Sequence, residues 1–402
     1  MVATPSRCGP PRRTMLPEGI EGWVVTRYAD VRAVLSDPRF VRDPVRVARL
    51  RSGAGLGPVS GGGGRVARGE TLLHLDPPEH TRIRRGVSPL FSARRTEGHR
   101  SMIDASATTL VGRCAGSGRA DLVCDLAVPL AVGVLCRVAG LPSGDHTRFG
   151  TWVRTVHRIE GGAEAGQRIV EAIAAIDRYL DERIADGSVT GVLAELAELV
   201  GRPRASSDPS PSEPGLTEDE LVAFGRDLLV GGYESTAVLI SGGLALLLAE
   251  PARYQRLRRE PEALDATVEE CLRQVAPFPQ VQARYATQEM DLGGVRIGSG
   301  EAVIADIAAA NRDPDRFPDP DRWSPAASAG HLSFGHGTHH CLGAGLARWE
   351  ARAAMRAVIT GLDDVRLACS PEDLVWEPGL SPTLRSLPVR FTPRPIRDGD
   401  GS

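Results

Sequence analysis

The stretch from His331 to Arg348, HLSFGHGTHHCLGAGLAR, constrains this chain more than any other part of the sequence. A single cysteine, Cys341, follows a glycine-rich turn and precedes a run of residues that favours a helix. Gly335 and Gly337 allow a tight turn with positive φ, where other residues would be strained. Because the dipole at a helix N-terminus favours an anionic sulfur, this order predicts one thiolate aimed at a metal.

The surroundings of Cys341 narrow the kind of metal site. Gly343 has no side chain, so a large flat group can lie against the helix that follows. A mononuclear zinc site would need more sulfur or imidazole ligands at fixed spacing, and the sequence contains no CxxC motif. The alternative is an inert buried thiol, which is the usual fate of a lone cysteine.

The segment resembles the haem-ligand loop of the cytochrome P450 family, which reads F-G-x-G-x-H-x-C-x-G-x-x-L-A-R. Every fixed position of that pattern is met in this chain. The resemblance implies that Cys341 is the metal ligand, supplying the axial thiolate of haem b (iron protoporphyrin IX). It also implies that Phe334, His339 and Gly343 contact the cofactor.

Composition excludes several other classes of protein. With 48 basic and 51 acidic residues the net charge is −3, and 42% of residues are hydrophobic, so no nucleic-acid partner is expected. The start lacks the apolar region of a secretory signal, and no apolar run approaches the ~20 residues that span a bilayer. Seven scattered cysteines do not suggest a disulfide framework, so a cytoplasmic location is expected. All basic residues are arginines, which hints at an actinobacterial source.

The first part of the chain carries few structural signals. Residues 1–21 are expected to form a loose N-terminal segment, followed by a short β-type segment and a helix. Residues 41–72 alternate arginines with glycine and serine and show no hydrophobic period, which predicts a mobile loop. The resemblance implies that this loop covers the substrate entrance and orders on binding; the alternative is a featureless surface loop.

Residues 75–85, LDPPEHTRIRR, predict a helix that starts near two prolines. This helix places His80 and Arg84 on one face, at i and i+4, where two donors can clamp a carboxylate. The resemblance implies that the pair holds a haem propionate, and that Arg284 is a second propionate-binding arginine. The neighbouring arginines are expected to form a solvated basic face or a surface for an acidic redox partner. They are Arg82, Arg85, Arg94, Arg95 and Arg100.

A capping box at Thr217 predicts the start of a long helix that contains Gly231 and Gly232. Two adjacent glycines destabilise a helix by roughly 1 kcal/mol each relative to alanine. A flat ligand packed on the helix, or a local widening of it, would compensate. We therefore expect both glycines to contact the cofactor.

The same helix is expected to carry the catalytic groups. The resemblance places an acid followed by an alcohol here, in the pattern A-G-x-E/D-T, to deliver protons to dioxygen. Glu234 matches the acid, whereas Ser235 stands where the family has threonine. Serine keeps the hydroxyl but lacks the methyl group that restricts the rotamer. Thr236, one residue later, is a weaker candidate.

Glu270 and Arg273 are spaced at i and i+3, which usually indicates a surface ion pair of little energetic worth. The resemblance implies instead a buried pair that braces the cysteine loop. The family usually carries a further arginine before that loop, but residues 323–330 have none. Our hypothesis is that Arg322 or His331 takes its place.

The resemblance covers residues 22–392, with residues 393–402 as a C-terminal tail. It implies a mainly α fold with small β-sheets, in a single triangular domain, and a haem-thiolate monooxygenase. Such an enzyme would hydroxylate or epoxidise a small organic substrate, free or carrier-bound, and tailor a secondary metabolite. Because the chain has no flavin or nicotinamide fingerprint, electrons are expected from a ferredoxin and its reductase. A monomer without membrane contact is expected.

Two other functions stay open. The first is oxidative coupling, dehydrogenation or decarboxylation without oxygen insertion, which the departure at Ser235 slightly favours. The second is a haem-bound protein that recruits other enzymes without turnover, and the intact acid and hydroxyl argue against it. The sequence does not identify the substrate.

Overall fold

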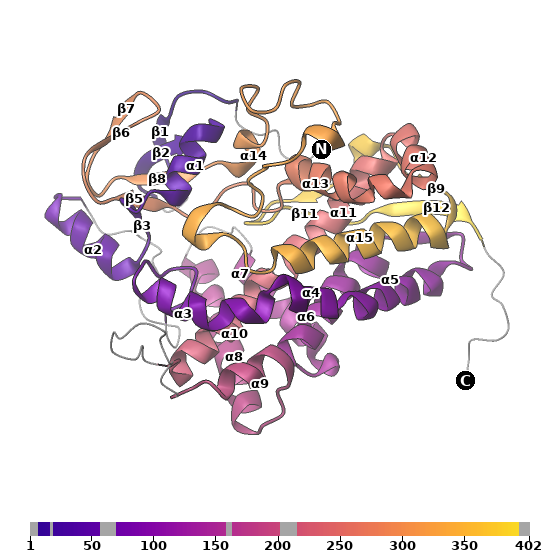
Figure 1. Ribbon diagram of the computed structural model, residues 1–402, viewed down its shortest axis with the longest axis horizontal. Helices are drawn as coiled ribbons and strands as arrows, with labels where there is room; N and C mark the ends of the chain where they lie inside the picture. The colour runs from indigo at the N-terminus through magenta and orange to yellow at the C-terminus, as the bar shows by residue number, and fades with distance from the viewer. Residues whose placement is uncertain (1–6, 17–18, 57–69, 158–162, 202–214, 394–402) are drawn as a thin grey trace.

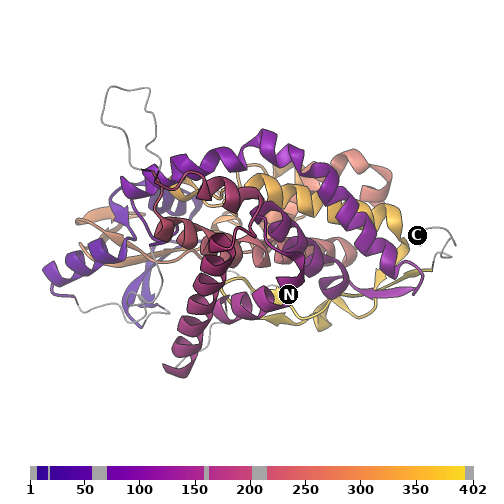
Figure 2. The same ribbon diagram turned by 90° about the horizontal axis from the view of Figure 1, so that it is seen from below.

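The chain is mainly α-helical with small β-sheets, as the sequence predicts. The computed structural model describes residues 7–16, 19–56, 70–157, 163–201 and 215–393. A β-rich part, with α1 and α2 beside it, lies at one side of the molecule, and the longer helices spread across the rest (Figures 1 and 2).

The elements have the following bounds. The α-helices are α1 (Tyr28–Ser36), α2 (Pro44–Gly53), α3 (Glu79–Val87), α4 (Ala93–Gly98), α5 (Arg100–Cys114), α6 (Val128–Ala139), α7 (His146–His157), α8 (Ala163–Ala185), α9 (Gly191–Ala197), α10 (Glu218–Gly232), α11 (Glu234–Leu248), α12 (Pro251–Arg259), α13 (Leu264–Val275), α14 (Ile307–Ala310) and α15 (Ala344–Gly361). The strands are β1 (Arg12–Met15), β2 (Glu21–Val25), β3 (Phe40–Val41), β4 (Arg119–Asp121), β5 (Arg284–Ala286), β6 (Met290–Leu292), β7 (Val295–Ile297), β8 (Ala302–Ala305), β9 (Asp363–Leu367), β10 (Trp376–Glu377), β11 (Thr383–Leu384) and β12 (Pro388–Thr392).

The largest sheet has the strand order β1-β2-β8-β5-β3 and places Arg284 on β5. Only the β2–β8 pair in it is parallel. The prediction of a loose segment over residues 1–21 is wrong for β1, which pairs with β2 from Arg12 to Met15. Leu16 is 3% exposed and packs at Gly22, where a Cβ would lie 2.4 Å from the leucine Cδ1. Pairing with β1 covers an edge of β2 that would otherwise be open.

The predicted mobile loop over residues 41–72 is also partly wrong, because its first part forms α2. Asp43 caps this helix by accepting hydrogen bonds from the N–H groups of Val45 and Arg46, both at 2.9 Å, and Pro44 occupies the first turn. An aspartate followed by proline is a standard helix start, so a local signal was present. Residues 57–69 of the predicted loop lie outside the described residues.

The helix predicted to begin at Thr217 does so, with both hydrogen bonds of the capping box present. It does not run through as one helix, because Tyr233 interrupts it between α10 and α11. The two helices together, Glu218–Leu248, are long and apolar enough for a membrane span by length and composition. However, 72% of the most apolar window is buried inside the protein, as expected of a core helix.

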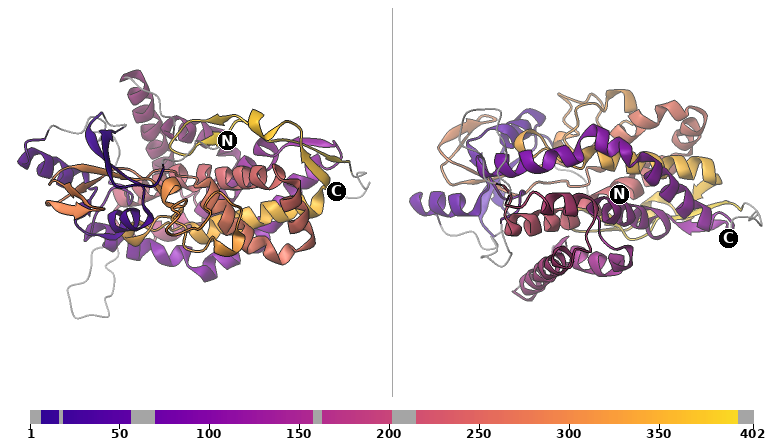
Figure 3. Two further views of the ribbon diagram at one scale, coloured as in Figure 1. Left: turned by 90° about the horizontal axis from the view of Figure 1, so that it is seen from above. Right: turned by 60° about the horizontal axis from the view of Figure 1, so that its bottom comes forward.

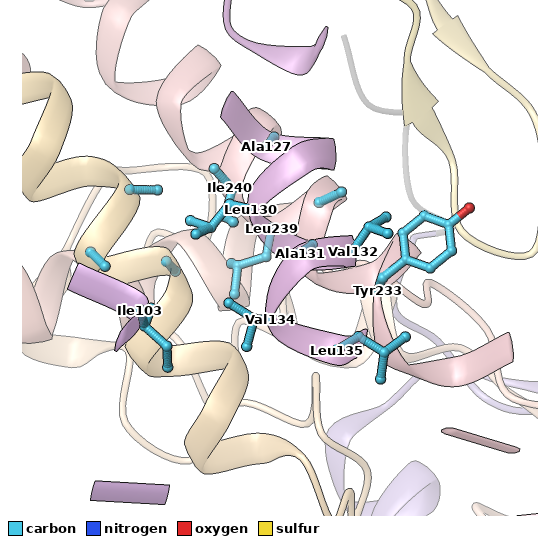
Figure 4. Packing of buried hydrophobic residues seen from close by; sticks show 14 of the residues in the cluster. Ile103, Ala127, Leu130, Ala131, Val132, Val134, Leu135, Tyr233, Leu239 and Ile240 are labelled. Atoms are coloured by element: carbon cyan, nitrogen blue, oxygen red, sulfur yellow. The ribbon is translucent and has the colours of Figure 1, made fainter. Parts of the chain in front are cut away.

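The core forms where α6 lies against α11. Figure 4 shows Leu130 and Ala131 of α6 beside Leu239 and Ile240 of α11. At Gly232 the backbone comes so close to α6 that a Cβ would lie 2.7 Å from Cδ1 of Leu135. The missing side chain of Gly232 therefore serves helix packing, which differs from the cofactor contact expected from the sequence.

The buried brace implied for Glu270 and Arg273 is present on α13. Glu270 is 0% and Arg273 2% exposed, and the guanidinium donates to both carboxylate oxygens at 2.7 and 2.8 Å. Arg273 also donates to the carbonyl groups of Asn311 and Pro320, at 2.9 and 2.8 Å. The brace thus ties α13 to the chain segment that leads into the cysteine loop.

The arginine that the family usually carries before the cysteine loop is replaced, as a donor to Glu270, by two uncharged groups. Glu270 Oε1 accepts from the Gln274 side-chain amide at 3.1 Å and from the Ser324 N–H at 3.0 Å. Arg322 contributes only its backbone carbonyl, and its side chain is exposed, so the hypothesis is wrong for Arg322. His331 contacts Glu269 at 3.2 Å instead of Glu270, and so supports the loop through the neighbouring glutamate.

Replacing Gln274 by leucine is expected to lower the free energy of unfolding by about 1–3 kcal/mol, because a buried carboxylate oxygen loses a donor. The matched change Arg322→Ala alters an exposed side chain and is expected to stay within about 0.5 kcal/mol of the parent. Urea denaturation of both variants measures the difference. Equal losses of unfolding free energy in the two variants would contradict the assignment of Gln274 as a donor to Glu270.

Candidate functional site

The cysteine loop has the turn that the sequence predicts. Gly335 and Gly337 adopt φ values of 72° and 71°, and the Cys341 N–H donates to the Phe334 carbonyl at 2.9 Å. A Cβ on Gly337 would lie 2.7 Å from the Leu35 carbonyl oxygen, so α1 packs directly on the turn. The helix after the loop, α15, begins three residues beyond the cysteine.

Opposing effects act on the pKa of the Cys341 thiol. Desolvation raises its pKa, whereas a backbone hydrogen bond at Gly343 and the guanidinium groups of Arg84 and Arg348 lower it. A Cβ on Gly343 would lie 3.9 Å from the sulfur. Gly343 therefore lies in van der Waals range of the sulfur, and the sequence prediction that its missing side chain lets a flat group lie against the helix stays a prediction.

Two arginines hold the loop to the rest of the protein. Arg84 on α3 donates to the His340 carbonyl, next to the cysteine. Arg348 on α15 lies over the Phe334 ring at 4.5 Å and makes hydrogen bonds of 2.6 and 2.9 Å to Glu269 on α13. The loop is thereby fixed between three helices.

A cluster of cationic and imidazole side chains lies next to this loop. His80 on α3 is 1% exposed and its ring contacts that of His339 at a centroid distance of 4.3 Å. Burial lowers the pKa of His80 to about 4 and that of His339 to about 2, with Arg42 and Arg284 adding to both shifts. Arg84 and His80 line a hollow of about 550 Å³. The expected i, i+4 face of α3 is thus present.

Several buried nitrogen atoms of this cluster have no hydrogen-bond partner among the described residues. They are both ring nitrogens of His80 and the Nε atoms of Arg42 and Arg284. A buried cation or donor without a partner is costly, so such a group of atoms indicates an anionic ligand. A haem fits this arrangement, because its two propionate carboxylates would meet the unpartnered nitrogen atoms and its iron would meet the Cys341 sulfur.

Arg42 was not found from the sequence. It follows β3 directly, its side chain lies near Arg284, and burial lowers its pKa to about 9. Asp76 fixes the local backbone by accepting hydrogen bonds from the N–H groups of Arg42 and Asp43, both at 3.0 Å. The Asp-Pro helix start would have placed Arg42 in an ordered segment, but only the tertiary structure brings it to the cluster.

The residues expected on the other side of the cofactor lie at the break between α10 and α11. Gly231 faces open space, Glu234 is 8% exposed, and the Ser235 hydroxyl donates to the Gly231 carbonyl at 3.3 Å. Thr236 is 4% exposed, whereas Ser235 is only half-buried. Of the two hydroxyl groups, the one on Ser235 is therefore the more accessible.

The described residues contain no group of three or more histidine, cysteine, aspartate or glutamate side chains that could hold a metal ion. A single protein sulfur as axial ligand agrees with this.

Fold, thiol and donor cluster together define a haem-thiolate protein, and the chain belongs to the cytochrome P450 family. The family model for cytochrome P450 matches residues 204–362. Cys341 is the axial thiolate ligand of haem b, and the chain is a monooxygenase that activates dioxygen to hydroxylate or epoxidise an organic substrate.

Particular relatives span nearly the whole chain. The chain is similar to the cytochrome P450 monooxygenase PikC of Streptomyces venezuelae, at 36% identity over 95% of this chain and 88% of the relative. It is 39% identical to the mycinamicin IV hydroxylase/epoxidase of Micromonospora griseorubida, over 92% of this chain and 89% of that one. The crystal structure of myxobacterial CYP267B1 with myristic acid matches at a TM-score of 0.82 and 33% identity, covering 96% and 94% of the two chains.

Replacing Arg42 by glutamine is expected to weaken haem binding roughly tenfold, because a charged hydrogen-bond donor to the cofactor is lost. Arg49→Gln, on the exposed side of α2, is the matched control and is expected to keep parental affinity. The rate of haem transfer to apomyoglobin measures the effect. Similar rates for Arg42→Gln and the parent would rule out Arg42 as a propionate ligand.

Proposed function

We propose that this monooxygenase hydroxylates or epoxidises a secondary metabolite and uses Glu234 and Ser235 to supply protons. The observation that carries this proposal is the buried acid beside a half-buried hydroxyl, at a helix break that opens at Gly231. The names of two relatives support the substrate class: the mycinamicin IV hydroxylase/epoxidase and the 6-deoxyerythronolide B hydroxylase of Saccharopolyspora erythraea.

The cofactor-binding roles follow from the donor cluster. Haem b, when bound, supplies the iron at which dioxygen is reduced and activated. Its propionates would be held by Arg42, His80, Arg84, Arg284 and His339. Phe334, Gly343 and Gly231 would contact the ring, and Gly232 acts beside them through its packing on α6.

Proton delivery requires a group that can both accept and donate a hydrogen bond. The Ser235 hydroxyl does so: it donates to Gly231 now, and can accept from Glu234 while it donates into the pocket. Without the threonine methyl group its rotamer is less restricted, so the acid must be held more firmly. Thr236 is the weaker proposed donor because it is buried, at 4% exposure.

The partners are proposed from the resemblance of the sequence to the family. A ferredoxin with its reductase is the proposed electron donor, in a cytoplasmic, monomeric enzyme. Three of the arginines expected at a docking surface are already paired: Arg82 with Glu220, Arg95 with Glu195, and Arg100 with Glu97. A carrier-bound substrate is an alternative to a free one, since the related P450BioI crystallised with an acyl carrier protein that carried a fatty acid.

Ser235→Ala is expected to lower the product formed per reductant consumed by roughly tenfold, with hydrogen peroxide formed instead, because proton delivery is lost. Ser235→Thr is expected to match or exceed the parent, and Thr236→Ala to change the ratio less. The assay uses a macrolactone that binds the enzyme, a ferredoxin and its reductase. Unchanged coupling in Ser235→Ala would refute the role of the hydroxyl.

Labelled dioxygen separates oxygen insertion from the other oxidations. The proposal expects one labelled oxygen atom in the product. A product without the label would favour coupling or dehydrogenation, a chemistry suggested by the 31% identical structural relative SgvP, described as a putative thioether synthase. Absence of turnover with every donor and substrate would favour a recruitment role.

A further inference from the structure

The break between α10 and α11 leaves consecutive carbonyl groups without their helical partners. No i to i+4 hydrogen bond closes over Val230, Gly231 or Gly232, since α10 ends at Gly232 and α11 begins at Glu234. These residues are half-buried, and carbonyl groups that are shielded from water need donors from elsewhere. The Ser235 hydroxyl serves Gly231, so the donor for Val230 must come from another element.

That donor is His157, the last residue of α7, which packs on α10. Its side chain is buried, at 4% exposure, and hydrogen bonds to the backbone of Val230. This bond raises the pKa of the ring, so its acceptor is the carbonyl oxygen and the ring nitrogen carries the hydrogen. The His157 ring therefore supplies a hydrogen bond to a carbonyl group that the break between α10 and α11 leaves without its helical partner.

The other side of the same ring faces the catalytic acid. Nδ1 of His157 contacts Oε2 of Glu234. Both atoms are buried, and neither has a satisfied hydrogen bond among the described residues, so each is the nearest polar group available to the other. The imidazole thus joins the last turn of α10 to the first turn of α11.

The orientation of His157 is fixed by two further segments. The Phe278 ring lies edge-on at a centroid distance of 5.9 Å, and the His157 carbonyl accepts from the Leu380 N–H at 3.1 Å. At Gly379 a Cβ would lie 3.1 Å from that carbonyl oxygen, so the two segments are closely packed there. The ring has little freedom to leave Glu234.

The protonation of the pair follows from its surroundings. Burial lowers the pKa of His157 to about 4, so the imidazole is neutral at neutral pH. With its one hydrogen directed at Val230, Nδ1 offers a lone pair to Glu234. A favourable contact between that lone pair and a carboxyl oxygen requires a proton, which Glu234 must carry.

We propose that His157 is a positioning residue that holds the Glu234 carboxyl in its neutral, proton-bearing form next to Ser235. This inference rests on the proposed role of Glu234 as proton donor. When Glu234 gives its proton to Ser235, the serine hydroxyl passes its own proton into the pocket. The carboxylate then faces the Nδ1 lone pair, a repulsive contact, and one proton from water restores the acid.

Substitutions at position 157 separate the two contacts of the ring. An asparagine amide reaches the position of Nδ1, whereas a glutamine amide reaches that of Nε2. Product formed per reductant is expected to fall roughly tenfold in His157→Gln and His157→Phe, and to stay within about threefold of the parent in His157→Asn. Val153→Ala, a buried packing change one turn earlier in α7, is the matched control and is expected to keep parental coupling.

Infrared spectroscopy of the resting holoenzyme gives a readout that needs no substrate. A carbonyl stretch of a protonated carboxylic acid is expected at neutral pH, assigned to Glu234 by its loss in Glu234→Gln. It is expected to move to higher frequency in His157→Phe and His157→Gln, because the O–H loses its acceptor, and to stay in place in Val153→Ala. Absence of this band from the parent, or no shift in His157→Phe, would overturn the proposal.

Haem content and the reduced carbon monoxide spectrum establish that each variant is folded and loaded. If His157→Phe fails to fold, His157→Gln tests the same loss. Full coupling in Glu234→Gln would defeat the proposed role of the acid. Loss of coupling in Glu234→Gln together with parental coupling and infrared bands in His157→Phe would defeat the role of His157 alone.

Discussion

The attachment of the Cys341 loop to its surroundings is the constraint on which the rest of the structure depends. Its backbone is closed by the bond from Cys341 to Phe334 and is tied to α3 by Arg84. Arg348 and Glu269 join it to α13, where the buried Glu270 brace begins. A sulfur can serve as an axial ligand only if its position is fixed before the ligand arrives, and these contacts fix it. Figure 3 shows α15, in orange-yellow, which follows the loop and packs along the purple α5.

The second constraint is a cluster of buried arginine and histidine side chains whose nitrogen atoms are only partly satisfied, although the Asp76 carboxylate acts on both Arg42 and Arg284. Arg42 follows β3, His80 lies on α3 and Arg284 on β5, and each side chain has a buried nitrogen without a hydrogen-bond partner among the described residues. Such an arrangement destabilises the folded state, and a bound dianionic group would stabilise it by pairing with these nitrogen atoms. The protein is therefore built to be most stable with its cofactor, and the sheet that carries Arg284 acts as part of the binding site.

Much of the site could be predicted from the sequence because its signals are local. The cysteine turn, the i, i+4 pair on α3 and the capping box each depend on spacing within a few residues. Gln274 was missed although it stands only four residues after Glu270. Arg42 and His157 could not be predicted, because each acts on residues far away in the chain. The break at Tyr233 was missed for the same reason: its carbonyl groups are served by Ser235 and by a histidine on another helix. β1 likewise depends on a partner strand that local composition does not show.

The central claim is that Cys341 ligates the iron within a site that holds the haem independently through its propionates. The reduced carbon monoxide difference spectrum of the parent and of Cys341→Ser tests it most directly. The account predicts the red-shifted thiolate band in the parent, and its loss in Cys341→Ser while the haem stays bound. A Cys341→Ser protein that kept the thiolate band would contradict the assignment of the ligand.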